Sequence, residues 1–289
     1  MSWNKGVEKL LTQKLNKEVN ILSEHQMGGG SINDARVVKT TMGEYFVKIN
    51  SASRYPKMFE KEAKGLVLLA ETNAIAVPAV VGFGVDGKDA FLILNVIKSA
   101  AKSANFWKQF GEALAALHRN TNQNFGLDHD NYIGSLPQRN RQHDNWPEFF
   151  RDERLEPMVA MAFNNGCIDR SMIRQFEKFY SRLDDLFPDE PPALIHGDLW
   201  AGNFMVGERG EPVVIDPAVY YGHREMDLGM SQLFGGFEQS FYDAYNRVFP
   251  LEPGWQERLE LYNLYPLMVH VNLFGGGYAG SVKNIIRGF

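Results

Sequence analysis

The chain has 289 residues, which is long enough for two domains. Of these residues 44% are hydrophobic and 22% charged, a composition typical of globular proteins. Its 30 basic and 35 acidic residues give a net charge of −5, which argues against nucleic acid as the main partner, because binding a polyanion needs a basic face. The first fifteen residues lack the apolar core of a signal peptide, and no apolar run approaches the roughly 18 residues that span a bilayer. Cys167 is the only cysteine, so a reducing compartment fits. We therefore predict a cytoplasmic protein that binds neither membrane nor nucleic acid.

The first hundred residues predict an antiparallel sheet of five strands with one inserted helix. A first helix is expected over residues 6–15, where the apolar residues have helical spacing. Met42-Gly43 and Asp86-Gly87 are typical hairpin turns, and the amphipathic stretch 55–72 predicts the inserted helix. The expected strands cover residues 19–27, 35–41, 44–49, 77–85 and 90–97.

After residue 99 the pattern changes to helices. Helices are expected over residues 104–120, 146–165, 168–186, 225–234, 238–249 and 255–274. The polar stretch 134–145 predicts a loop that is long enough to contribute to a ligand-binding site. The change of pattern predicts an α+β protein of two domains, residues 1–98 and 99–289. The first would be a small β-rich lobe and the second a larger, mainly helical lobe.

A polar loop between two short apolar runs carries the strongest chemical signal. It contains Asp198 and Asn203, whose spacing matches the kinase catalytic loop H-x-D-x-x-x-x-N, in which the Asp deprotonates the attacking hydroxyl and the Asn holds magnesium. The apolar run 212–215 then leads into Asp216, and a carboxylate at the end of a buried strand is costly unless a charged group meets it. A metal ion carrying nucleotide phosphates would do so. Either carboxylate alone could be an ordinary turn or cap residue, but together with Asn203 they predict a phosphoryl-transfer site.

The β-rich part supplies candidates for the nucleotide phosphates. Lys48 lies in an expected strand one hairpin after a glycine run, as the kinase β3 lysine does. An ammonium in an apolar strand needs an anionic partner, and Glu62 on the following helix is preferred over Glu60. The run Gly28, Gly29, Gly30, Ser31 would let backbone N–H groups approach phosphates, although three glycines also make an ordinary flexible turn.

Two other glycine patterns are interpreted as structural. Residues 82–88 fit G-x-x-x-x-G-K, but Asp89 follows where a phosphate loop requires Ser or Thr. Residues 275–280 fit G-x-G-x-x-G, yet no βαβ unit surrounds them, so we expect a connection between helices. His118 is expected in the core, and His196 is expected to orient its loop.

The sequence resembles the fructosamine kinase (ketosamine kinase) family, which belongs to the aminoglycoside-phosphotransferase-like branch of the protein-kinase-like fold. The resemblance covers nearly the whole chain. The most specific match is the stretch Asp216-Pro217-Ala218-Val219-Tyr220-Tyr221-Gly222-His223-Arg224-Glu225-Met226-Asp227-Leu228. Further matches are His196 to Asn203, Phe46 to Lys48, Met58 to Glu62, Asn131 to Gly134, Pro137 to Asn140 and Asp144 to Phe150.

The resemblance implies transfer of the γ-phosphate of ATP, with Mg²⁺, to the 3-hydroxyl of a fructosamine or ribulosamine, which leads to deglycation of the amine. Asp198 would be the catalytic base and Asn203 and Asp216 the metal ligands. Lys48, paired with Glu62, would hold the α- and β-phosphates. Asn95, Val96 and Ile97 would be the hinge whose backbone holds adenine, and Asp227 would brace the catalytic loop.

ATP-Mg²⁺ is expected in the cleft between the lobes, with the acceptor hydroxyl held over Asp198. We expect the amine-bearing tail of the acceptor to lie towards Gln138, Asn140, Trp146 and Tyr220. Trp200 stands where protein kinases carry a lysine, which argues against a protein substrate. It is also a candidate for contact with the sugar-amine acceptor. The sequence leaves open whether the glycated amine is free or a lysine on a protein, and it leaves the oligomeric state open. The alternatives are a kinase of the same fold for an aminoglycoside, choline or homoserine, and an inactive nucleotide-binding scaffold.

Overall fold

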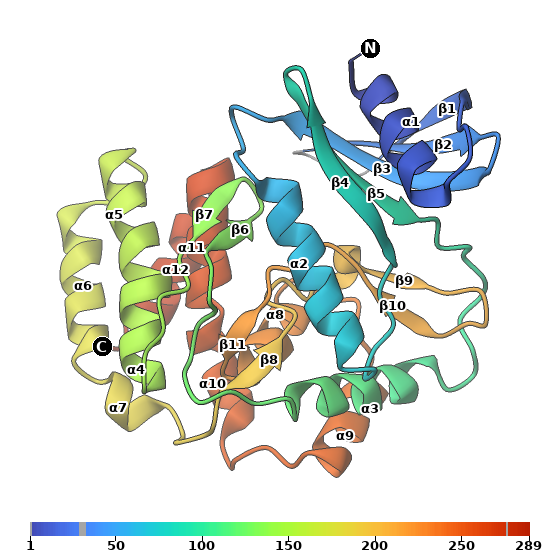
Figure 1. The fold of residues 1–289 in the computed structure, drawn as a ribbon. Helices are drawn as coiled ribbons and strands as arrows, with labels where there is room; N and C mark the ends of the chain where they lie inside the picture. Colours follow the sequence, from blue (N-terminus) through green and yellow to red (C-terminus); the bar gives the residue numbers. More distant parts are fainter. Residues whose placement is uncertain (1, 29–32, 276) are drawn as a thin grey trace. The chain divides into compact units, whose positions relative to one another are not determined.

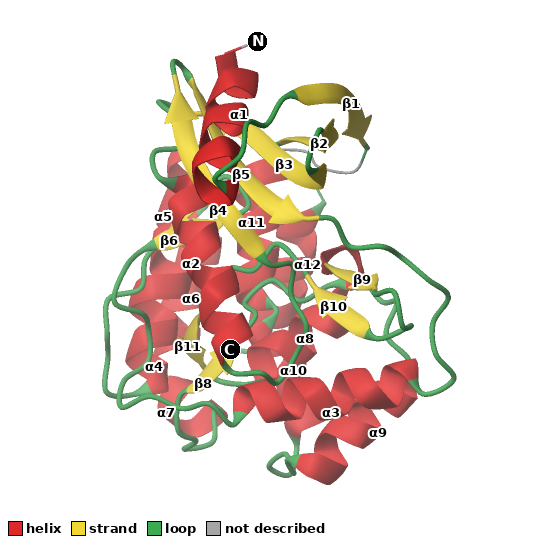
Figure 2. Cartoon of the chain, turned by 45° about the vertical axis from the view of Figure 1, so that its right-hand side comes forward, coloured by secondary structure: helices red, strands yellow, loops and turns green. Residues whose placement is uncertain are grey.

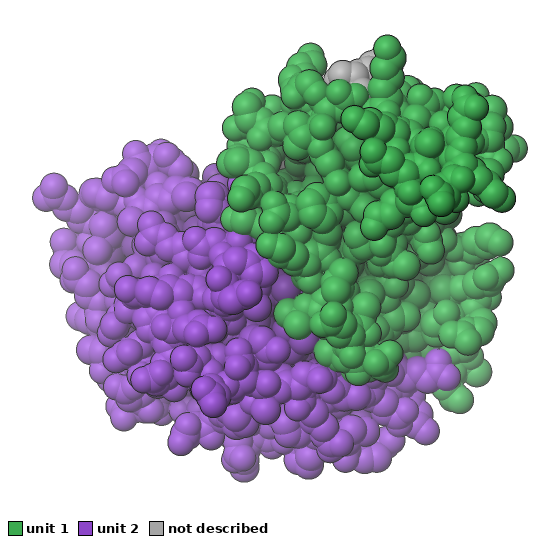
Figure 3. Space-filling model, viewed as in Figure 1, with its two compact units in different colours: residues 1–106, 205–216 green, residues 107–204, 217–289 purple. Residues whose placement is uncertain are grey.

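The structure is a computed structural model that describes residues 2–28, 33–275 and 277–289. The chain divides into two compact units (Figure 3), unit 1 with residues 1–106 and 205–216 and unit 2 with residues 107–204 and 217–289. Among the described residues, no helix combines the length and the apolar character needed to cross a bilayer.

Unit 1 is built on the antiparallel five-stranded sheet that the sequence predicts. The strand order is β1-β2-β3-β5-β4. Both expected hairpins form, with Thr40 opposite Gly43 and Asp86 opposite Asp89. The strands are β1 (Ile21–Met27), β2 (Asp34–Thr40), β3 (Gly43–Ser51), β4 (Val80–Asp86) and β5 (Asp89–Asn95).

Two helices pack against this sheet (Figure 1), α1 (Ser2–Leu15) and α2 (Met58–Glu71). Because side chains alternate along a strand, β5 contributes Phe91 and Ile93 to a core with α1, and Leu92 and Leu94 to a core with α2. In β3 the same alternation assigns Val47 and Ile49 to the α1 core. The side chain of Lys48, between them, therefore points to the side of α2.

A second hairpin completes unit 1. It consists of β9 (Phe204–Val206) and β10 (Pro212–Val214). The backbone N–H of Val214 donates to Ala76 (2.9 Å), and Ser103 donates to Gly210 (3.1 Å). These bonds join a segment from late in the chain to the β-rich part, and β10 leads directly to Asp216.

Unit 2 is mainly helical (Figure 2). Two of its short strands, β8 and β11, pair with each other, and the other two, β6 and β7, form a hairpin. Its helices are α3 (Phe106–His118), α4 (Trp146–Phe149), α5 (Glu156–Asn164), α6 (Arg170–Tyr180), α7 (Leu183–Leu186), α8 (Glu225–Leu233), α9 (Gln239–Val248), α10 (Trp255–Tyr262), α11 (Leu264–Phe274) and α12 (Tyr278–Ile286). Its strands are β6 (Asn131–Ile133), β7 (Leu136–Gln138), β8 (Ala193–Ile195) and β11 (Tyr220–Gly222).

Several local predictions for unit 2 were wrong. The expected loop 134–145 contains β7, which pairs with β6 just before it; both strands have three residues, too few to show an alternating pattern. The expected helix 146–165 contains a π-helical segment, Phe150–Leu155, between α4 and α5. The expected helices 168–186 and 255–274 are each divided in two, the latter at Asn263. The helix α12 was expected only as the element after the connection 275–280, and it begins within that range although it contains Gly280, a residue of low helix propensity.

Among the residues that the structure describes, the two other glycine patterns lie in connections between elements, as expected. Gly87 has φ +59 in the tight turn between β4 and β5, so no phosphate-binding helix follows it. Gly275 and Gly277 lie between α11 and α12, whereas residues 278–280 already belong to α12. Gly276 lies outside the described residues.

Candidate active site

In unit 1, Lys48 forms ion pairs with two carboxylates. Its Nζ lies 2.7 Å from Oε1 of Glu62 on α2 and 2.8 Å from Oδ1 of Asp216. The expected pair with Glu62 is therefore present, and the competitor Glu60 pairs instead with Lys64, at 3.0 Å. Burial alone would lower the pKa of Lys48, but attraction to Glu62 and Asp216 outweighs it and raises the pKa above its ordinary value. The lysine therefore stays charged.

Asp216 has an unusual backbone and an available carboxylate. Its φ of +55 lies in the left-handed region, which Asp tolerates better than most residues but still at a cost. Such strain persists only where surrounding structure holds it, and it concentrates at functional sites. The side chain is 46% exposed although Lys48 contacts one of its oxygens. One ammonium shared by two carboxylates leaves a negative charge, which favours a cation.

The other predicted nucleotide-binding residues of unit 1 lie at the ends of strands. The pairing of β5 with β3 ends at Asn95, so the backbone groups of Val96 and Ile97 follow the last paired residue. Asn95 itself is exposed. Gly28 follows β1 directly, whereas Gly29, Gly30 and Ser31 lie outside the described residues.

In unit 2, Asp227 on α8 holds the start of the catalytic loop. It accepts the backbone N–H groups of His196 (2.7 Å) and Gly197 (2.9 Å), and it accepts Nε2–H of His118 at 3.1 Å. Burial alone would raise the pKa of Asp227, yet the hydrogen bond and charge of His118, with the N–H of Gly197, hold it below the usual value. Nδ1 of His118 faces the hydroxyl of Tyr245, at 2.8 Å. The expected bracing by Asp227 and core position of His118 are confirmed by these contacts.

Glycine is required at position 197. Its φ is +82, and a Cβ there would collide with the carbonyl oxygen of Ala218. Ala218 in turn donates its N–H to the carbonyl of His196, at 2.9 Å. The catalytic loop and the segment 217–220 therefore lie directly against each other within unit 2.

Asp198 and Asn203 are linked by the amide of Asn203. Its Nδ2 donates to the backbone carbonyl of Asp198 (2.8 Å) and to Oδ2 of the same residue (2.9 Å). Because both N–H groups point to Asp198, Oδ1 of Asn203 is left as a hard oxygen ligand, of the kind that Mg²⁺ prefers. Asp198 is half-buried on this loop.

Asp216 in unit 1 and Asn203 in unit 2 each carry an oxygen of the kind that binds magnesium. Mg²⁺ in kinase sites uses one or two protein oxygens together with substrate phosphates. Asp216 and Asn203 each offer such an oxygen. In the part of the chain that the structure describes, there is no group of three or more His, Cys, Asp or Glu side chains that could form a complete protein cage.

The side chains expected to face the amine end of the acceptor are enclosed by unit 2. Gln138 and Asn140 are each 1% exposed, Trp146 is 2% exposed and Tyr220 is fully buried. Trp146 stacks on His223 with the ring centroids 4.6 Å apart. These four side chains have almost no exposed surface for a ligand, so the expectation that they contact the acceptor was wrong. They instead position the backbone next to the catalytic loop.

Two buried amides hold the segment that follows Asp216. Nε2 of Gln138 donates to the carbonyl of Ala218 (3.0 Å), and Nδ2 of Asn131 donates to that of Val219 (2.8 Å). The amides also bond each other, with Nε2 of Gln138 2.7 Å from Oδ1 of Asn131. Tyr265 on α11 donates its hydroxyl to Oε1 of Gln138, at 2.8 Å. The β6–β7 hairpin thereby fixes the backbone that packs against Gly197.

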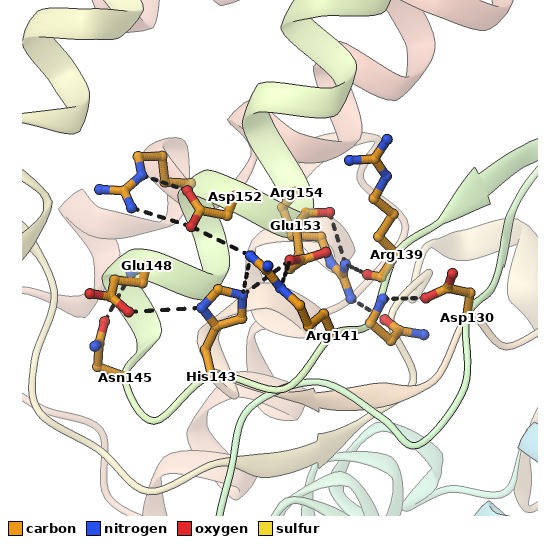
Figure 4. Close-up of polar contacts among 11 residues, drawn as sticks. Asp130, Arg139, Arg141, His143, Asn145, Glu148, Asp152, Glu153 and Arg154 are labelled. Atoms are coloured by element: carbon orange, nitrogen blue, oxygen red, sulfur yellow. Dashed lines mark hydrogen bonds and ion pairs between the residues drawn. The ribbon is translucent and has the colours of Figure 1, made fainter.

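Arg154 in the π-helical segment supports this hairpin. Its guanidinium donates to Oδ1 of Asn140 (2.7 Å) and to the carbonyl of Arg139, and it lies 3.8 Å above the ring of Tyr220. The next stretch of chain is tied to the same segment (Figure 4), because Arg141 and His143 both contact Glu153, at 3.0 and 3.1 Å. Sequence reasoning missed Arg154 and Asn131 as site residues. Two signals could have indicated them. Arg154 is a charged residue close in sequence to aromatic residues, and Asn131 is an amide in the same short segment as Gln138.

Several known proteins are similar to this chain in sequence. A sequence model described as fructosamine kinase matches residues 3–289. A protein named "Probable ketoamine kinase" from Synechocystis sp. is 38% identical over 278 residues, covering 96% of this chain and 93% of that protein. The chloroplastic protein-ribulosamine 3-kinase of Arabidopsis thaliana is 38% identical over 275 residues, covering 93% of this chain and 83% of that protein.

Solved structures show the same fold. A crystal structure described as "Putative fructosamine-3-kinase" from Thermobifida fusca has a TM-score of 0.87 and 35% identity, and the match covers 97% of each chain. The aminoglycoside phosphotransferase APH(4)-Ia has a TM-score of 0.62 at 17% identity, covering 98% of each chain, a likeness of fold alone. The predicted α+β class and protein-kinase-like fold are thereby confirmed. The chain belongs to the fructosamine kinase family.

Proposed function

We propose that this protein transfers the γ-phosphate of ATP to the 3-hydroxyl of a fructosamine or ribulosamine. The observation that carries the proposal is the catalytic loop of unit 2. There Asp227 fixes the backbone at His196 and Gly197, and Asn203 orients the carboxylate of Asp198. This is how a carboxylate is positioned to accept a proton from an attacking hydroxyl. Membership of the fructosamine kinase family supports the sugar-amine as acceptor.

In the proposed reaction Asp198 accepts the proton of the sugar hydroxyl while its oxygen attacks the γ-phosphorus. The new O–P bond forms as the bond from the γ-phosphorus to the bridging oxygen of ADP breaks. General-base catalysis of this kind contributes roughly 10²–10⁴-fold, and the rest comes from positioning and neutralisation of charge. Loss of the phosphorylated sugar would then release the amine.

The residues assigned to the nucleotide are those that the family resemblance indicates. Lys48, kept charged by Glu62 and Asp216, would bind the α- and β-phosphates. The glycine run from Gly28 and the backbone of Asn95 to Ile97 would hold the phosphates and adenine. Asn203 and Asp216 would hold Mg²⁺, which supplies positive charge to the phosphates. Two structures of the same fold are described with nucleotide analogues, amicoumacin kinase hAmiN with AMP-PNP and APH(4)-Ia with AMP-PNP and hygromycin B.

Two alternative functions are disfavoured. An inactive scaffold is disfavoured because Lys48, Glu62, Asp198, Asn203 and Asp216 are all present with the contacts described above. Another acceptor, such as an aminoglycoside, choline or homoserine, is disfavoured by the names of the relatives at 38% identity. We also propose that the reaction takes place in the cytoplasm, where a single cysteine stays reduced.

The test is transfer of the γ-phosphate to matched acceptors. Ribulosamine and fructosamine adducts of one amine would be incubated with ATP and Mg²⁺, with an aminoglycoside, choline and homoserine as controls. We expect phosphorylation of at least one sugar-amine and of none of the controls. Turnover of a control acceptor in preference to both adducts would contradict the proposed function.

A further inference from the structure

Five aromatic side chains form a continuous row in unit 2 that begins at the catalytic loop. The ring centroids of Trp200 and Phe234 lie 6.0 Å apart, and those of Phe234 and His270 lie 4.9 Å apart. His270 is 5.0 Å from Tyr278 and 5.5 Å from Phe274. These separations are those of packed aromatic rings. We call this set the aromatic row.

The aromatic row is open to solvent. The exposed fractions are 38% for Trp200, 40% for Phe234 and 57% for Phe274. Among the described residues of unit 2, four large hydrophobic side chains are exposed, and three of them belong to the row; the fourth is Phe163. Single exposed apolar residues need no explanation, but adjoining ones indicate a binding surface.

The row is fixed relative to Asp198 by the elements that carry it. Phe234 follows α8 directly, and α8 is the helix whose Asp227 holds the catalytic loop. Two residues further on, a Cβ at Gly236 would lie 2.7 Å from Cβ of Ala201, so this turn packs against the catalytic loop. Trp200 itself is two positions after Asp198. A ligand whose hydroxyl lies at Asp198 would therefore have the row beside it.

His270 gives the row a hydrogen-bond acceptor. Its Nδ1 lies 2.7 Å from the carbonyl of Pro266, which can only accept, so Nδ1 carries the proton. Burial lowers the pKa of His270, so the ring is neutral at pH 7 and Nε2 has a free lone pair. A neutral ring does not repel an ammonium group, and Nε2 can accept one of its N–H groups.

We propose that the aromatic row binds the amine end of the acceptor, and that this acceptor is a small glycated amine with an aromatic or long alkyl substituent. The inference rests on the proposed function, because the sugar hydroxyl must lie at Asp198. The amine of such an adduct is a cation, which aromatic faces attract, and its substituent has apolar surface to bury. The row has five residues, whereas a stable protein interface has about 20–30 on each side, so the row suits a small ligand.

The experiment compares two acceptors that share one sugar, the adducts of benzylamine and of methylamine. In the unmodified protein we expect the benzylamine adduct to have the lower KM, by roughly 5- to 30-fold, the effect of one aromatic contact with a ligand cation or ring. Phe274→Ala and Phe234→Ala should each raise the KM of the benzylamine adduct several-fold. The KM for the methylamine adduct should rise less, because that adduct has the cation but no ring to bury, and the KM for ATP should stay the same.

Two further variants separate a ligand contact from a loss of folding. Phe274→Tyr keeps the ring and should retain the low KM for the benzylamine adduct. Phe163→Ala removes an exposed ring outside the row and should behave like the unmodified protein. Equal KM values for the two adducts in the unmodified protein would overturn the inference, as would an effect of Phe163→Ala equal to that of Phe274→Ala.

The same assay distinguishes the two proposals. Phosphorylation of both adducts without any difference between them leaves the proposed function standing and refutes the role of the aromatic row. Failure to phosphorylate either adduct, or any other sugar-amine, refutes the proposed function and with it this inference.

Discussion

Lys48 and Asp216 are separated by 168 positions in the chain, yet Nζ of one lies 2.8 Å from Oδ1 of the other. The contact forms because β10 is joined to the β-rich part of the chain through Ala76, so that unit 1 contains Asp216 as well as Lys48 and Glu62. The proposed phosphate-binding lysine and one proposed metal ligand thus belong to the same compact unit.

Replacing this lysine should impair both catalysis and stability. Lys48→Met leaves Glu62 buried without its cation, and breaking a buried ion pair costs about 3–5 kcal/mol in unfolding free energy. We expect a value at the lower end, because Asp216 is half exposed, and a fall in kcat/KM for ATP of about 10²–10³-fold. Urea denaturation and steady-state kinetics measure the two effects. The control is Lys64→Met, which removes an exposed i,i+4 pair and should change neither quantity appreciably.

Asp198→Asn should separate chemistry from nucleotide binding. The amide cannot accept the proton of the sugar hydroxyl, so kcat should fall by about 10²–10⁴-fold. The Kd for ATP, measured by calorimetry, should remain unchanged, because Asp198 is not assigned to the nucleotide. Asp184→Asn, an exposed Asp at the start of α7, is the matched control and should retain full kcat. Full activity in the Asp198 variant would rule out the assigned base.

Asp227 should make stability depend on acid pH. Its pKa is lower in the folded protein than the ordinary value of about 3.9, so its contribution is fully present above that value and is lost as the pH falls through the folded pKa. Asp227→Asn should lower the unfolding free energy at pH 7, and the difference from the unmodified protein should shrink below about pH 4. Urea titrations at pH 7 and pH 3 test this. A difference that is the same at both pH values would contradict the assigned charge.

Gln138 should act on turnover through the backbone that it holds. Gln138→Leu removes the donor to Ala218 and leaves buried polar groups unsatisfied, which costs about 1–3 kcal/mol each. Because the segment 217–220 packs against Gly197, we expect kcat to fall while the KM for the acceptor changes little. A rise in the acceptor KM alone would instead support direct contact with the ligand.

The neighbour of Gln138 offers the control for that experiment. Arg139 is exposed, and only its backbone carbonyl contacts Arg154. Arg139→Ala should therefore leave kcat and the unfolding free energy close to those of the unmodified protein. Gln138→Glu, which keeps the shape and one hydrogen-bonding oxygen but loses the amide donor, should resemble Gln138→Leu in kcat.

The sequence by itself determined the elements of unit 1 and the identity of its charged residues. Strand alternation and hairpin turns are local signals, so they predicted the sheet, and the side of β3 on which Lys48 lies follows from the same alternation. The spacing of Asp198 and Asn203 is also local. The apolar run before Asp216 is a local signal as well, whereas only the family motif indicated Asp227; the fold then provided the contacts of both residues.

Only the tertiary structure decided which polar and aromatic residues near the site are buried. Gln138 and Asn140 look like ligand contacts in sequence, but their partners include Ala218 and Arg154, brought to them by folding. The aromatic row likewise joins Trp200 to rings some 35 to 80 positions later, by the packing of α8, α11 and α12. Local spacing fixes the face on which a side chain lies, whereas long-range packing decides whether that face meets protein or solvent.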